Sequence, residues 1–122
     1  MPVRGLTIVI AEASTARFRS ALTLALAQIA LGGAACIFLD GAAVALARIA
    51  LPATDDDMHI AAGLPSLAEL RDEALDAGMR LVLCQSGLAL TDSAAEDHDP
   101  RAEFGGMVGV LAAIGDDRLI MA

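Results

Sequence analysis

Short runs of aliphatic residues, separated by segments with helical spacing, constrain the fold of this 122-residue chain more than any other feature. Each run has the length and composition of one buried strand. The runs cover residues 6–11, 35–39, 79–84 and 118–121. Strands that alternate with helices predict a parallel sheet with helices on both faces. We therefore expect a single-domain α/β fold over residues 1–122, with four to five strands.

The segments between these runs carry signals for the beginning and end of helices. A helix over residues 17–31 can be capped by Ser14 or Thr15 and ends at a pair of glycines. Its apolar residues surround most of its circumference, which predicts that it is covered on more than one side. Ser66 and Glu69 form the capping box of another helix. The other expected elements are a short helix over residues 42–49, a solvated loop over residues 53–63, irregular chain after Leu90 and a last helix over residues 101–114.

Composition limits the classes of partner that the chain can bind. Eight arginines, no lysine and sixteen acidic residues give a net charge of −8, which disfavours nucleic acid and anionic membranes. Apolar residues make up 57% of the chain but aromatic residues only 2%, and mean hydropathy is +0.63. So much apolar surface on a small domain indicates an interface beyond the chain's own core. We therefore expect a homo-oligomer.

One stretch, residues 21–39, contains no formal charge and is close to the length of a membrane-spanning helix. Thr23, Gln28 and the pair Gly32-Gly33 divide it into a helical half and a strand-like half, which disfavours a transmembrane helix. The N-terminal residues show no signal peptide. We expect a cytoplasmic protein whose two cysteines are reduced thiols rather than a disulfide.

The two cysteines occupy different places in the predicted sheet. Cys84 ends the third strand, at the edge where functional sites of parallel sheets gather. If a helical turn begins at Gln85, its backbone N–H groups would favour the thiolate form of Cys84. The alternative is that Cys84 is a small buried hydrophobic residue. Cys36 lies early in the second strand, where packing in the core is the better interpretation.

The other candidate groups do not form a recognisable site in the sequence. The loop of residues 11–15 lacks the glycines of a nucleotide-binding motif, and we expect no cofactor. His59 and His98 each lie near aspartates, so a metal site that joins their two loops is conceivable. Neither histidine has a neighbour at metal-ligand spacing, and a solvated surface is the expected interpretation. No Ser-His-Asp set is evident either.

Three segments together resemble the DsrE/DsrF-like family over residues 6–122. They are LTIVIAEAS, GGAACIFLDGAAVAL and ELRDEALDAGMRLVLCQSGLAL, and the strand that ends in Cys84 is the most specific part. The resemblance implies a parallel α/β sandwich that assembles as a homo- or hetero-oligomer, often a trimer or hexamer. It also implies sulfur relay, in which the cysteine that matches Cys84 accepts sulfane sulfur as a persulfide. The chain lacks the extended motif around the cysteine of the sulfur-relay subgroups.

Three functional hypotheses follow. The first is a sulfur-carrier or sulfurtransferase-like protein that works through Cys84 with partner proteins, with Gln85 and Ser86 stabilising the thiolate. The second is a non-catalytic oligomeric module that binds a small ligand or a protein, with Cys84 lining a pocket. The third is a thiol redox sensor, which would need Cys36 within about 7 Å of Cys84, Cα to Cα.

Overall fold

A five-stranded, all-parallel sheet forms the centre of the molecule, in the order β4-β3-β2-β1-β5. The computed structural model describes residues 3–51 and 53–122. The strands are β1 (Leu6–Ile10), β2 (Ala35–Leu39), β3 (Arg80–Cys84), β4 (Glu103–Gly105) and β5 (Arg118–Met121). The predicted α/β class and parallel sheet are confirmed. The aliphatic runs that predict strands are almost completely buried in β1, β2 and β3.

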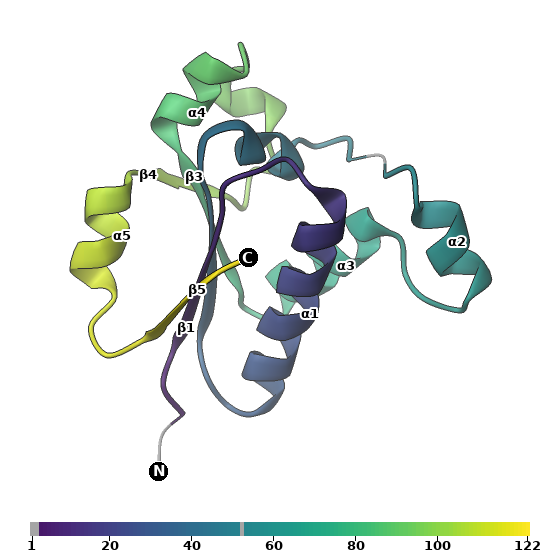
Figure 1. Ribbon diagram of the computed structural model, residues 1–122, viewed down its shortest axis with the longest axis horizontal. Helices are drawn as coiled ribbons and strands as arrows, with labels where there is room; N and C mark the ends of the chain where they lie inside the picture. Colours follow the sequence, from purple (N-terminus) through teal and green to yellow (C-terminus); the bar gives the residue numbers. More distant parts are fainter. Residues whose placement is uncertain (1–2, 52) are drawn as a thin grey trace.

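Helices cover the two faces of the sheet unequally (Figure 1). Helices α1 (Thr15–Ala30) and α3 (Leu67–Asp76) pack on one face, and the short helix α5 (Met107–Ala113) lies against the other. The remaining helical segments are η1 (Gly41–Ala47), a 3-10 helix, then α2 (Asp56–Ala61), α4 (Gln85–Leu90) and the short 3-10 turn η2 (Ala95–Asp97). Helix α4 follows β3 directly and η1 follows β2 after one residue, so both lie at the carboxyl end of the sheet (Figure 1).

The expected helix caps are present. The Ser14 hydroxyl accepts a hydrogen bond from the N–H of Arg17 at 3.1 Å, which begins α1. Ser66 and Glu69 form the capping box of α3. One side of α1 is buried through Phe18 and its neighbours, but Leu24 on another side is exposed, as is Leu31 directly after the helix. Within this chain, α1 is therefore not enclosed to the extent that its composition predicts.

Two predicted elements are wrong. The last predicted helix, residues 101–114, is instead the strand β4 followed by α5, because Gly105-Gly106 interrupts a helix and Glu103 pairs with Arg80 of the neighbouring strand. The predicted loop over residues 53–63 contains α2, whose first turn is acidic, as suits the N-terminus of a helix.

The uncharged stretch of residues 21–39 is divided between α1 and β2, as its glycines indicate. Among the described residues, no helix combines the length and the apolar character that crossing a membrane requires.

Candidate functional site

Cys84 is the last residue of β3, and α4 begins at the next residue. In the strand register Leu83 pairs with Leu39, the last residue of β2. Cys84 therefore lies level with Asp40, directly before Gly41. The residue is 8% exposed. Cys84 thus lies at the carboxyl edge of the sheet, close to the surface and next to the turn that opens η1.

The thiol of Cys84 is surrounded by hydrogen-bond donors. Its Sγ lies 2.9 Å from the Ser86 hydroxyl oxygen. The backbone groups of Gly87, Ser86 and Gly41 lie around it and also favour its charged form. The Ser86 hydroxyl, followed by these backbone groups, lowers the pKa of Cys84 below its ordinary value, although burial opposes the change. The site therefore favours a thiolate, the nucleophilic form of cysteine.

Two glycines allow this close arrangement. Gly41 has a φ of +55°, a conformation that glycine adopts without strain, where η1 leaves β2. A Cβ atom added to Gly87 would lie 2.5 Å from the carbonyl oxygen of Gly41 and 2.7 Å from Cγ1 of Val44. Only a glycine at position 87 lets α4 approach η1 this closely. The sequence signal for both residues is a glycine shortly after the end of a strand, in Asp40-Gly41 and Ser86-Gly87.

The residues predicted to support Cys84 behave differently. Ser86 contacts the thiol directly. Gln85 is exposed at the start of α4, and its role beside the thiol stays a prediction. Sequence reasoning missed Gly41 and Gly87 as donors, because their contribution depends on two loops that meet only in the folded chain.

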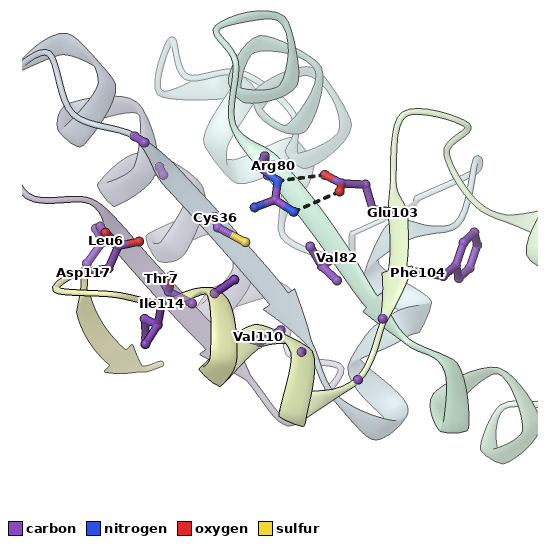
Figure 2. A pocket seen from close by; sticks show the side chains of 16 residues that line it. Leu6, Thr7, Cys36, Arg80, Val82, Glu103, Phe104, Val110, Ile114 and Asp117 are labelled. Carbon is purple, nitrogen blue, oxygen red and sulfur yellow. Dashed lines mark hydrogen bonds and ion pairs between the residues drawn. The ribbon is translucent and has the colours of Figure 1, made fainter.

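Cys36 lies in a different environment. It is half-buried in β2, packs against the edge of the core and faces a cavity beneath α5 (Figure 2). Burial raises the pKa of this thiol, although the nearby Arg80 guanidinium partly opposes the effect. Cys36 pairs in register with Arg80, and Arg80 lies four residues before Cys84 along β3. Four strand residues span about 13 Å, which is too far for a disulfide between the two cysteines.

The two histidines remain apart from this site. His59 lies beside Asp55 of its own segment, with Nδ1 2.8 Å from the Asp55 carbonyl oxygen. The solvated surface expected around His98 is wrong, because its ring is buried, with Nδ1 2.9 Å from the carbonyl oxygen of Ala94. In the part of the chain that the structure describes, no three His, Cys, Asp or Glu side chains are grouped so that they could hold a metal ion.

No model of a known protein family matches this chain, and no curated protein sequence matches it significantly.

Proposed function

We propose that this chain is a DsrE-like sulfur carrier that accepts sulfane sulfur on Cys84 as a persulfide and passes it to a partner protein. The observation that carries the proposal is the 2.9 Å contact between the Cys84 sulfur and the Ser86 hydroxyl, which together with three nearby backbone groups lowers the pKa of the thiol. These contacts favour the thiolate without a neighbouring cation. The resemblance of the segment around Cys84 to the sulfur-relay family supplies the kind of reaction.

The reaction needs one nucleophilic sulfur. The Cys84 thiolate attacks the outer, sulfane sulfur of a donor persulfide, R–S–SH. A new S–S bond forms to Cys84 as the donor's S–S bond breaks, and R–S⁻ leaves with the bonding electron pair and takes up a proton. In the second step an acceptor thiolate attacks the outer sulfur of the Cys84 persulfide. Each step exchanges one S–S bond for another, so no external oxidant or reductant is required.

The same hydrogen bonds assist both steps. In the first they raise the fraction of Cys84 present as thiolate, and in the second they stabilise the thiolate that Cys84 becomes as it leaves. A thiol of lower pKa is a better leaving group in thiol exchange. A site that stabilises the thiolate therefore suits a carrier, which must both accept sulfur and release it.

Intact-mass measurement after incubation with a small-molecule persulfide tests this proposal. We expect the wild-type chain to gain one sulfur atom, and Cys84→Ser to gain none. Cys36→Ala is the matched control, because it removes the other thiol and should gain sulfur as the wild type does. A wild-type chain that stays unmodified, or sulfur that accumulates equally on Cys84→Ser, would contradict the proposal and favour a non-catalytic binding module.

We further propose that the carrier is a homo-oligomer, a trimer or hexamer, assembled through its C-terminal strand. Leu119 and Met121 of β5 are 48% and 66% exposed, and within residues 3–51 and 53–122 β5 pairs with β1 alone. On the other face of this edge, Leu24 of α1 and Leu31, which follows the helix, line a shallow hollow with Ile120. An exposed apolar edge strand of this kind is usually covered by another chain.

Light scattering tests the assembly. We expect a mass of three or six chains at micromolar concentration, and dissociation to monomers in Met121→Asp. The matched control is Leu64→Asp, which places the same charge on an exposed apolar residue remote from β5 in the sequence. A monomeric wild-type chain, or equal dissociation in both variants, would refute the proposed interface.

A further inference from the structure

A cavity of about 210 Å³ lies between the sheet and α5, in the part of the chain that the structure describes (Figure 2). It exists because small residues, Gly105, Gly106, Gly109 and Ala113, form much of the wall on the side of α5. Side chains of Val82, Val110 and Ile114 supply its apolar surface. An engineered apolar cavity of roughly 150 Å³ is large enough for benzene. The space beneath α5 therefore fits a ligand with a body somewhat larger than one aromatic ring.

Two neutral polar groups line the sheet side of this cavity. Thr7 and Cys36 pair in register between β1 and β2, so their side chains lie on the same face. Thr7 is 4% exposed, and its hydroxyl can both donate and accept a hydrogen bond. The thiol of Cys36 is protonated at neutral pH, because burial raises its pKa. This wall of the cavity therefore offers polar atoms without charge.

The three charged residues that line the cavity are one arginine and two acidic residues. Arg80 binds Glu103 with two hydrogen bonds of 3.0 and 2.9 Å, so these two charges neutralise each other. The third charged residue is Asp117, whose carboxylate lies against Gly5, where any larger residue would collide with it. None of the ion pairs within the described ranges includes Asp117. Of the three charged residues that line the cavity, Asp117 is thus the one without an ion-pair partner among the described residues.

We propose that the cavity beneath α5 is a binding site for a small apolar monoamine. The apolar body fills the space between Val82 and Ile114, and the ammonium group lies against the Asp117 carboxylate, within reach of Thr7. A carboxylate or phosphate ligand would be repelled by the Asp117 carboxylate and is disfavoured. The site is separate from the sulfur chemistry, because Cys84 does not line the cavity.

Three ligands with one aromatic ring and different charge test this proposal: benzylamine, benzyl alcohol and benzoate. Each is titrated into the full chain, and the methyl NMR signals of Val110 and Ile114 report occupancy. We expect saturable shifts with benzylamine, and binding of benzoate weaker by about fivefold or more, the upper range for a partly exposed ion pair. Benzoate that binds as tightly as benzylamine, or no saturable shift with benzylamine, would overturn the proposal.

Two variants locate the ligand. Asp117→Asn should weaken the binding of benzylamine by about fivefold and leave the binding of benzyl alcohol unchanged. The control is Asp116→Asn, at an exposed neighbour outside the cavity, and it should change the binding of neither ligand. Gly109→Leu places a side chain where the structure has open space beside the cavity and should abolish binding. Ala113→Leu gives the same test if Gly109→Leu fails to fold. Benzylamine that binds Gly109→Leu or Ala113→Leu as tightly as the wild type would refute the proposed site.

Discussion

Removal of the Ser86 hydroxyl is the most direct test of how this fold activates Cys84. The Oγ atom of Ser86 lies 2.9 Å from the Cys84 sulfur and makes the largest contribution to the lowered pKa of that thiol. Ser86→Ala deletes this one contact and leaves the backbone of α4 in place. Because Ser86 is exposed at the start of a helix, the substitution should affect the thiol more than the stability of the fold.

The expected change in the reaction rate of Cys84 combines two opposing changes, in the fraction of thiolate and in the nucleophilicity of that thiolate. A hydrogen bond to a charged group is worth about 1.5 kcal/mol at the lower end of its range. Its loss reduces the thiolate fraction of Cys84 by about tenfold at pH values below the thiol pKa. The thiolate that remains is intrinsically more nucleophilic by about threefold, for a Brønsted coefficient of 0.4–0.5. Ser86→Ala should therefore react about threefold more slowly at low pH and about threefold faster at high pH, where both thiols are ionised.

The assay is the rate of Cys84 alkylation by iodoacetamide from mildly acidic to alkaline pH, in a Cys36→Ala background so that one thiol reports. Ser20→Ala, which removes an exposed hydroxyl of α1, is the control and should reproduce the parent profile. The two pH–rate profiles of parent and Ser86→Ala should cross. Profiles that coincide at every pH would refute the role assigned to the Ser86 hydroxyl.

Three other substitutions have expected outcomes. Gly87→Ala should destabilise the fold by about 1–3 kcal/mol in urea unfolding, because its Cβ would collide with η1, and should slow alkylation of Cys84. Arg71 is 3% exposed and donates hydrogen bonds to three backbone carbonyls in and just after η1, so Arg71→Met should cost about 3 kcal/mol of stability by the same measurement. The Arg101 guanidinium holds the pKa of Asp99 below its ordinary value, so the stability from this contact is present above the ordinary pKa and is lost as pH falls through the lower folded-state value. Asp99→Asn should therefore reduce stability at pH 7 and make unfolding less sensitive to acid, as measured by circular dichroism in a pH series.

The parts of the fold that sequence predicts well are those with local causes. Aliphatic runs predict β1, β2, β3 and β5 to within a residue or so, and a capping box places the start of α3. Strand β4 has no such cause. It is three residues long and mostly exposed, and the bidentate pair of Arg80 and Glu103 joins residues that lie 23 positions apart. A contact of that kind follows from the fold and cannot be found by periodicity, which is why residues 101–114 resemble one helix.

In the candidate site, too, some features have local causes in the sequence and others depend on the folded chain. The topology rule that places function at the carboxyl ends of parallel strands predicts the position of Cys84. Its electrostatic surroundings depend on the approach of η1 to α4, through Gly41 and Gly87, and no local pattern predicts that approach. The sequence does not predict the cavity beneath α5 either. Its walls come from four strands and from α5, a helix whose predicted start is wrong.

The two cysteines together favour sulfur transfer over redox sensing. Both lie on one face of the sheet, because Cys36 pairs with Arg80 and side chains alternate along β3. Their pKa values move in opposite directions, since hydrogen bonds stabilise the Cys84 thiolate whereas burial keeps Cys36 protonated. About 13 Å of strand separates them, so Cys36 cannot resolve a persulfide or sulfenic acid on Cys84 into an internal disulfide. In the proposed function, a sulfur atom accepted by Cys84 would therefore have to leave to a thiol of another molecule, as the proposal requires of a carrier.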